Sequence, residues 1–366
     1  MSPNKRTGRK RDYVGVLSSV FAIVIGLLVG FVILLICNPS QALPGFVTIL
    51  TGAFTHGLKG VGQVFYYATP IILTGLSVGF AFKTGLFNIG TPGQFIVGAF
   101  AAVYVGIMWT GLGRIQWAVA LLAAILGGAL WGMVPGVLKA CFNVNEVIAS
   151  IMMNYIGMYM VNWIVKSYKP LFNNLRNESR NVAATAQIPK MGMDKLFPES
   201  SVGGGILLAI AAVLIIWVIL NKTTFGYELK AVGFNRDASR YAGINEKRNI
   251  IMSMVIAGAI AGMAGGLLYL AGTGKHIEIK DVLASEGFTG ISVALLGLSH
   301  PIGVLFSGLF IAYLTAGGFY LQLFEFSTEI IDIIVAVIIY FSAFALIVKT
   351  ILTRMNRKRE KGGGRT

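Results

Sequence analysis

The sequence predicts an all-α, polytopic membrane protein, a bundle of about ten membrane-spanning helices. The chain has 366 residues, of which 55% are hydrophobic and 12% are charged, about half the charged share of a typical soluble domain. Its mean hydropathy is +0.75. Long blocks contain no Lys, Arg, Asp or Glu, for example between Asp12 and Lys59 and between Glu286 and Glu325. Blocks of this length are sufficient to cross a bilayer as helices.

Each apolar block is expected to be helical, because backbone groups inside a bilayer must be hydrogen-bonded within the protein. The alternating strands of a membrane β-barrel do not occur in the sequence. The ten predicted segments are 14–36, 64–82, 91–109, 117–138, 147–165, 203–220, 250–271, 286–299, 302–318 and 329–348. A shorter apolar stretch, 43–58, is predicted to lie along the outer face of the bilayer.

The formal net charge of +15 is concentrated in two tails, 1–12 and 351–366, at the ends of a membrane domain spanning 13–350. Basic clusters beside a membrane set topology and meet anionic lipid head groups. The lipid bilayer, and not a nucleic acid, is therefore the predicted partner of these charges. With both termini and the loop 221–249 inside and the loop 166–202 outside, 20 of the 30 basic residues lie on the inner side. This follows the positive-inside rule.

The sequence contains no motif for covalent chemistry. It has neither His-Glu-x-x-His nor Gly-x-Ser-x-Gly, and it has no Gly-x-x-x-x-Gly-Lys-Ser/Thr loop to hold nucleotide phosphates. His56, His276 and His300 are scattered, and Cys37 and Cys141 suffice for neither a disulfide framework nor a thiolate metal site. No metal, cofactor or catalytic residue is predicted, and any use of ATP requires a separate subunit.

Charges near the membrane leave a second transport class open. An ion-coupled carrier needs an ionisable residue within the bilayer, and the candidates are Glu146, Glu329 and Asp332. All three fall near predicted membrane interfaces, where charges that cap or anchor helices are common. A single-chain, ion-coupled secondary transporter of a small polar solute is thus the alternative to an ATP-driven system, and a membrane enzyme ranks third.

Polar residues inside apolar segments are the candidates for contact with a solute, because each costs free energy unless it has a partner. Their side chains are amides and hydroxyls, which suit a polar, uncharged solute. They are also suited to holding neighbouring helices together, and the sequence leaves both roles open. The candidate pathway residues are Asn88, Thr91, Gln94, Asn154, Thr289 and Ser292.

Two pairs of segments are interrupted by glycine or proline. Segments 286–299 and 302–318 are separated by Ser299-His300-Pro301, and segments 64–82 and 91–109 by a glycine-rich corner at 83–93. Interrupted segments in both halves of a transporter indicate a binding site between them. A five-plus-five inverted repeat fits the segment count, but no residue-level repeat supports it. Glycines spaced by four residues, such as Gly258 and Gly262, predict closely packed helices.

The segment 224–244 is polar, periodic and predicted to be inside. It is expected to form two short helices broken at Gly233-Phe234-Asn235, with a positive φ at Gly233. An apolar stripe through Ala238, Tyr241 and Ala242 favours a docking surface for a cytosolic partner over a solvated connector. A bulky charged residue at Ala238 is therefore expected to uncouple this partner from transport.

This segment resembles the cytoplasmic coupling segment of permeases of the ribose/branched-chain amino acid type ABC importers. The matching residues are Gly226, Lys230, Ala231, Val232, Gly233, Asn235, Ala238, Ser239, Ala242, Gly243 and Ile244. Further stretches resemble the nucleoside, or simple-sugar-like, branch: 85–90 with 93–94, 145–148 with 153–156, and 293–297 with 301–303. Together they cover most of 64–318, whereas the loop 166–202 matches no branch.

The resemblance implies a type II importer permease of about ten helices in a bacterial plasma membrane. It implies a second permease subunit, identical or a paralogue, a pair of cytosolic ATPases and an extracellular solute-binding protein or lipoprotein. The solute would be a nucleoside or a simple sugar, and this subunit would form the pathway. The residues implied in ATPase coupling are Gly226, Lys230, Gly233, Asn235, Arg236, Ala238, Arg240 and Gly243.

Overall fold

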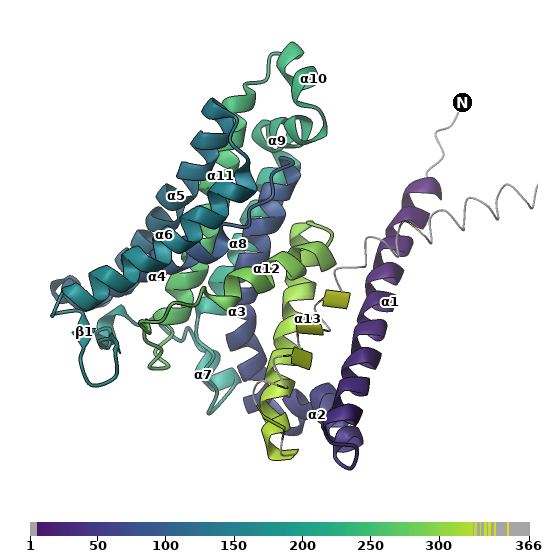
Figure 1. The fold of residues 1–366 in the computed structure, drawn as a ribbon, viewed down its shortest axis with the longest axis vertical. Coiled ribbons are helices and arrows are strands. Elements are labelled where there is room, and N and C mark those ends of the chain that lie inside the picture. Colours follow the sequence, from purple (N-terminus) through teal and green to yellow (C-terminus); the bar gives the residue numbers. More distant parts are fainter. Residues whose placement is uncertain are drawn as a thin grey trace, which may run out of the picture. The chain divides into compact units, whose positions relative to one another are not determined.

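The computed structural model describes residues 6–324 and, beyond them, positions 326, 327, 330, 333, 334, 336, 337, 340, 341 and 350. Within these residues the chain is mostly helical (Figure 1). The α-helices are α1 Arg6–Cys37, α2 Ala42–Thr55, α3 Gly57–Lys83, α4 Thr91–Met108, α5 Gln116–Phe142, α6 Glu146–Ser167, α7 Met193–Leu196, α8 Gly205–Lys222, α9 Thr224–Phe234, α10 Arg236–Tyr241, α11 Glu246–Tyr269, α12 Ser285–Leu296 and α13 Pro301–Phe319. Short 3-10 helices are η1 Thr110–Ile115, η2 Ala184–Ala186 and η3 Tyr320–Phe324, and the strands are β1 Phe172–Asn173 and β2 Glu178–Ser179.

Seven helices in the described part of the chain are long and apolar enough to cross a membrane. They begin and end at Gly57–Lys83, Thr91–Met108, Thr110–Phe142, Glu146–Ser167, Gly205–Lys222, Glu246–Tyr269 and Pro301–Phe324. Each corresponds to one predicted segment, so an all-α polytopic bundle is confirmed. The predicted number of about ten is not.

The three remaining segments differ in outcome. Segment 286–299 is wrong as a full span, because α12 has only 12 residues and is therefore about 18 Å long, short of the roughly 30 Å hydrocarbon core. Segment 14–36 falls inside α1, whose described apolar part is Ile23–Cys37. Most of segment 329–348, including Glu329 and Asp332, lies outside the described residues. The stretch 43–58 is largely helix α2.

The chain divides into two units, 1–55 with 314–366 and 56–313. In the first unit α1 is followed by α2, and Phe31 and Phe46 bring their ring centroids within 5.0 Å. A Cβ at Gly45 would lie 3.0 Å from the ring of Phe326 and 3.2 Å from Leu321, so these residues pack against the start of α2.

The second unit is built around α11, which packs against α3, α4 and α5. Glycines permit this close approach, since a Cβ at Gly258 would overlap the carbonyl of Gly128 on α5. A Cβ at Gly98 of α4 would likewise overlap Gly262 of α11. The predicted role of the four-residue glycine spacing in tight helix packing is thus confirmed.

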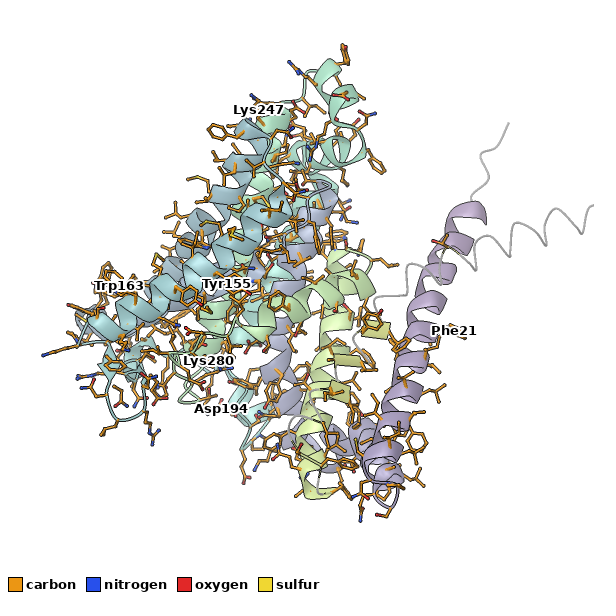
Figure 2. All side chains as sticks on the ribbon, in the orientation of Figure 1. Phe21, Tyr155, Trp163, Asp194, Lys247 and Lys280 are labelled. Carbon is orange, nitrogen blue, oxygen red and sulfur yellow. The ribbon has the colours of Figure 1, made fainter. Side chains whose placement is uncertain are left out.

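The two ends of this second unit differ in character. Helices α9 and α10 cap one end, and the segment containing β1, β2 and α7 covers the other (Figure 1). Figure 2 places Lys247 at the α9–α10 end and Lys280 and Asp194 toward the opposite end, with Tyr155 projecting from α6 between them. Charged side chains at the ends of an apolar bundle are what a membrane-spanning unit requires.

The irregular segments of the second end are tied to each other. Ser179 donates its backbone N–H to the carbonyl of Ile277 at 2.9 Å, and its hydroxyl accepts from the N–H of Ile277 at 3.0 Å. Glu178 and Glu278 form an antiparallel bridge. These bonds join the loop after α6 to the loop between α11 and α12.

Candidate functional site

Helix α9 is fixed to the bundle by its apolar side. The hydroxyl of Thr223 caps it by accepting from the N–H of Gly226 at 3.1 Å. Leu229 and Val232 are fully buried, and Val232 belongs to a core cluster with Leu86 and Met254. These two residues therefore hold α9 in place and leave its other side exposed.

The predicted pair of short helices with a break within Gly233-Phe234-Asn235 is confirmed, but the predicted positive φ at Gly233 is wrong, because Gly233 lies inside α9. The break occurs at Asn235, whose extended backbone ends α9 and whose side-chain oxygen accepts from the N–H of Ala238 at 3.0 Å. This is an N-cap for α10. The residue with positive φ is Gly243, at +82°, which terminates α10.

Gly233 is required at its position for a different reason. A Cβ there would overlap the carbonyl oxygen of Lys83 and lie 3.0 Å from the carbonyl carbon of Thr84. The backbone of α9 therefore rests directly on the end of α3. This backbone contact joins the predicted coupling segment to a helix long enough to span the membrane.

The outward side of α9 and α10 carries large side chains that the described part of the chain leaves largely exposed. Phe234 and Tyr241 are 92% and 94% exposed, and Tyr227 is 70% exposed. Beside them is an open groove of about 570 Å³. Its lining residues are Thr224, Tyr227, Glu228, Ala231, Phe234, Asn235, Ala238, Ser239, Ala242 and Ile244. Of the predicted stripe, Ala238 and Ala242 line this groove, whereas Tyr241 is exposed outside its lining. The exposed Tyr227 and Phe234 were not predicted.

Three basic residues lie on the two helices that form the groove. Lys230, Arg236 and Arg240 form no salt bridge with another described residue. The positive charge of Arg236 interacts favourably with the carboxylate of Glu146, the first residue of α6. Glu146 itself pairs with Lys139 at 2.9 Å, across the corner between α5 and α6. The structure thus places Glu146 at a helix end with a basic partner.

The corner between α3 and α4 is held by buried amides. Asn88 and Gln94 form two reciprocal side-chain hydrogen bonds of 2.9 and 3.1 Å. Asn154 on α6 accepts from the N–H of Gly93 at 2.8 Å and donates to the carbonyl of Ile89 at 2.9 Å. Thr91 donates to the carbonyl of Asn88 at 3.1 Å.

These four candidate residues, Asn88, Thr91, Gln94 and Asn154, are at most 1% exposed. Their hydrogen bonds in this structure are the ones expected of residues that hold helices together. Thr289 and Ser292 lie apart from them on α12, where both are partly exposed. The structure therefore joins four of the six candidates into one network, and contact with a solute stays a prediction for all six.

The start of α12 meets the start of α4 beside this network. A Cβ at Gly287 would lie 2.6 Å from Cα of Pro92, and one at Gly290 would lie 2.6 Å from the carbonyl carbon of Thr74. The two pairs of interrupted segments singled out in the sequence are thus neighbours in space. Sequence reasoning missed Ser77, whose hydroxyl donates to the carbonyl of Ala257 at 2.7 Å and accepts from Asn88 at 3.4 Å.

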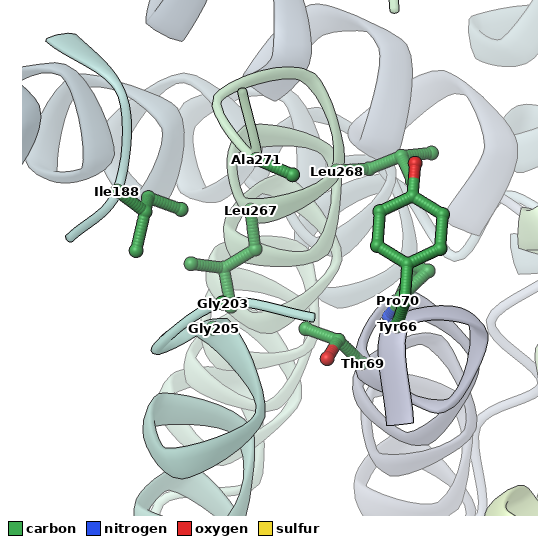
Figure 3. Close-up of a pocket in the computed structure, with 9 residues that line it drawn as sticks. All are labelled: Tyr66, Thr69, Pro70, Ile188, Gly203, Gly205, Leu267, Leu268 and Ala271. Atoms are coloured by element: carbon green, nitrogen blue, oxygen red, sulfur yellow. The ribbon is translucent and has the colours of Figure 1, made fainter. Parts of the chain in front are cut away.

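A small cavity of about 20 Å³ lies among α3, the start of α8 and the end of α11. Figure 3 shows Tyr66, Thr69 and Pro70 of α3 beside residues of α11. The cavity has room for about one water molecule and none for a solute.

His300, in the turn between α12 and α13, has a lowered pKa, chiefly because burial disfavours its charged form and secondarily because Lys83 is positive. Among the described residues, no group of three or more His, Cys, Asp or Glu is arranged to hold a metal ion.

Comparison with known proteins gives the family. Residues 60–343 match the model described as "Branched-chain amino acid transport system / permease component". The guanosine ABC transporter permease protein of Bacillus subtilis is 38% identical over 93% of this chain and 96% of its own length. The nucleoside ABC transporter permease protein of Lactococcus lactis is 35% identical over 93% of each chain.

A glucose ABC transporter permease protein of Haloferax volcanii is 31% identical over 81% of this chain and 78% of its own length. No solved structure matches the chain. The family match covers most of the sequence and agrees with a bundle of apolar helices that carries an uncovered surface at one end. The chain therefore belongs to the family of permease components of branched-chain amino acid transport systems, and it is a multi-pass membrane protein.

Proposed function

We propose that this chain is the membrane-spanning permease subunit of an ATP-binding-cassette importer for nucleosides. The observation that carries the proposal is the likeness, at 38% and 35% identity over 93% of the chain, to permeases named for guanosine and nucleosides. The chain forms the pathway and performs no covalent chemistry, and ATP hydrolysis belongs to a separate subunit.

The α9–α10 surface docks onto that ATPase at the cytoplasmic face. Its exposed Phe234 and Tyr241 support this role, because large aromatic side chains outside the lipid are the usual anchors of a protein interface. Arg236 and Arg240 add charge complementarity to an acidic partner, with exposed pairs contributing about 0–1 kcal/mol each. Docking energy therefore comes mainly from the aromatic and alanine-lined groove.

This docking surface is shaped by Gly226, Gly233, Asn235 and Gly243. A Cβ at Gly226 would overlap the carbonyl of Ile219, so this glycine allows the sharp corner between α8 and α9. Lys230 lies on the same helix and supplements the positive charge.

The topology proposed for the chain places the α9–α10 end and both termini in the cytoplasm of a bacterial cell. The loop 166–202 then lies outside, where it meets a solute-binding protein or lipoprotein. A second permease subunit, identical or a paralogue, completes the pathway with this chain.

Within this chain, the pathway is bordered by the place where α4 and α12 begin. Thr289 and Ser292 contribute partly exposed hydroxyls on α12. Asn88, Thr91, Gln94 and Asn154 form the adjoining network and hold the start of α4 in register. Irregular backbone is tolerated at membrane depth where it lines a cavity or is buried in protein, which suits a pathway at this corner.

A simple sugar is the second candidate solute, because the glucose permease of Haloferax volcanii is also similar over 81% of this chain. Its identity of 31% is lower than that of the two nucleoside permeases. A nucleoside contains a sugar, so both solutes share vicinal hydroxyls.

The solute class is tested by measuring uptake in two kinds of cells, one lacking this gene and one carrying it on a plasmid. We expect radiolabelled guanosine uptake to depend on the gene and to be inhibited by other unlabelled nucleosides at equal concentration. Glucose and leucine are the control competitors and should have little effect. Inhibition by glucose or leucine as strong as by a nucleoside would assign the permease to that other solute.

A further inference from the structure

A cavity of about 340 Å³ lies in the second unit, and its lining includes Lys280, which Figure 2 places toward the end opposite α9 and α10. Its wall combines apolar Ile96 and Met158, the aromatic Tyr269, and polar Asn162, Lys275 and Glu286. These residues come from α4, α6, α11, the following loop and α12. The volume falls within the range of about 300–1,000 Å³ found for small-molecule sites.

The polar part of this cavity is built around one ion pair. Nζ of Lys275 lies 3.1 Å from a carboxylate oxygen of Glu286, and their side chains are 40% and 26% exposed. The hydroxyl of Ser285 donates to the other carboxylate oxygen at 3.4 Å. Glu286 lies in the first turn of α12, where the helix dipole favours a negative charge. The carboxylate is therefore held in place within the cavity wall.

The backbone around the cavity points to a water-filled space. Between Leu270 and Ala284 the chain has no helix, and the amide of Asn162 donates to the carbonyl of Lys280 at 3.0 Å, tying this loop to α6. Irregular backbone beside membrane helices is tolerated where it is enclosed by protein or borders water. The short helix α12 begins here, as the interrupted helices of transporters do at their binding sites.

A second hollow shares one lining residue with this cavity. His276 lines both this cavity and a second, open hollow of about 780 Å³, which the loop after α6 borders. Lys169, Arg176 and Arg180 line that outer hollow. The two hollows therefore adjoin at His276.

We propose that this cavity is a solute subsite at the extracellular mouth of the permease, and that it takes a nucleoside. The ring of Tyr269 and the apolar side chains of Ile96 and Met158 suit a planar base, since aromatic rings stack on bases. The carboxylate of Glu286 accepts hydrogen bonds from the two ribose hydroxyls, and the ammonium of Lys275 donates to a ribose oxygen. This inference rests on the proposed nucleoside function and names a site for it.

Protection of a cysteine in the cavity wall tests the subsite. In a background with Cys37→Ser and Cys141→Ser, Ser285→Cys introduces a thiol at an exposed position of the lining, and Val282→Cys provides a second position. A membrane-impermeant maleimide added outside the cell should label both, and guanosine should slow the labelling. Ribose and guanine, tested separately, should protect less than guanosine.

Glu286→Gln removes the charge and keeps the shape of the side chain. It should raise the guanosine concentration for half-maximal protection at least about tenfold, because hydrogen bonds to a carboxylate are stronger than bonds to an amide. Glu199→Gln is the matched control, since it breaks an exposed ion pair with Lys59 at the same end of the unit. The control should leave protection unchanged.

The outcomes separate the subsite from the proposed function. Guanosine uptake by the intact transporter without protection at either cysteine overturns the subsite and leaves the function standing. Equal effects of Glu286→Gln and Glu199→Gln also overturn the role of Glu286. Absence of any nucleoside uptake overturns the proposed function and, with it, the nucleoside subsite.

Discussion

Replacing Gly233 with valine is expected to reduce ATP-driven uptake at least about tenfold while the membrane bundle stays folded. The added side chain overlaps the carbonyl oxygen of Lys83, so α9 must move away from the end of α3. Overpacking of this kind costs about 1–3 kcal/mol, and a tenfold change in rate corresponds to about 1.4 kcal/mol. Because the contact joins α9 to α3, we expect the variant to lose the coupling between ATP hydrolysis and transport. Uptake and ATP hydrolysis are measured on the same assembled transporter.

Two further variants separate coupling from general damage. Gly111→Val makes the same chemical change at a position where an added Cβ meets nothing within 4 Å, and it should behave as the unmodified protein. Ala238→Glu places a charge in the groove and should weaken ATPase binding instead of displacing α9. If Gly233→Val transports at the normal rate with normal ATP hydrolysis, the α9–α3 contact does not transmit coupling.

Asn154→Leu is expected to destabilise the bundle by about 2–5 kcal/mol. The substitution leaves the N–H of Gly93 and the carbonyl of Ile89 without their partner, and each unsatisfied buried group costs about 1–3 kcal/mol. Transport should fall with the loss of folded protein, because the start of α4 loses its attachment to α6. Thermal unfolding in detergent, followed together with uptake, measures both effects.

Tyr155→Leu is the control for this change, since Tyr155 is the next residue of α6 and is 46% exposed. It should change stability little. A stable Asn154→Leu protein that transports poorly would favour direct contact between Asn154 and the solute. A stable protein that transports normally would show that these hydrogen bonds matter for neither stability nor transport.

The sequence was sufficient for the parts of the fold that depend on hydropathy. Seven of the predicted segments became helices long enough to span a bilayer, because runs of apolar residues force helical backbone. Segment 286–299 was misjudged since its composition stays apolar through Gly297 and Leu298, where the helix has already ended. The position of that end depends on packing against α3 and α13, which hydropathy does not describe.

The coupling segment was predicted as two short helices, but the reason given for Gly233 was wrong. A glycine between two polar stretches suggests a turn, whereas here it permits contact between α9 and a residue 150 positions earlier, Lys83. A distant contact of this kind has no local signature. The same holds for Asn88, Gln94 and Asn154, whose polarity was visible in the sequence. The bonds between the Asn88 and Gln94 amides, and those of Asn154 with the backbone of Gly93 and Ile89, were not visible there.

The ion pair between Lys275 and Glu286 likewise has no local signature in the sequence. Eleven positions separate them in the sequence, too far for neighbours on one helix, and Glu286 begins a predicted segment whose true length was unknown. Only the irregular path from Leu270 to Ala284 brings the two charges together. A charged pair across such a loop could not be predicted from spacing.

The proposed ATP-driven import is tested most directly by guanosine accumulation in proteoliposomes. These contain this permease, its partner permease and the ATPase, with the solute-binding protein added. We predict that accumulation requires ATP on the side of the membrane that corresponds to the cytoplasm. It should persist when ionophores dissipate the proton and sodium gradients. Accumulation by the purified chain alone, driven by an ion gradient and independent of ATP, would contradict the account and establish a secondary transporter.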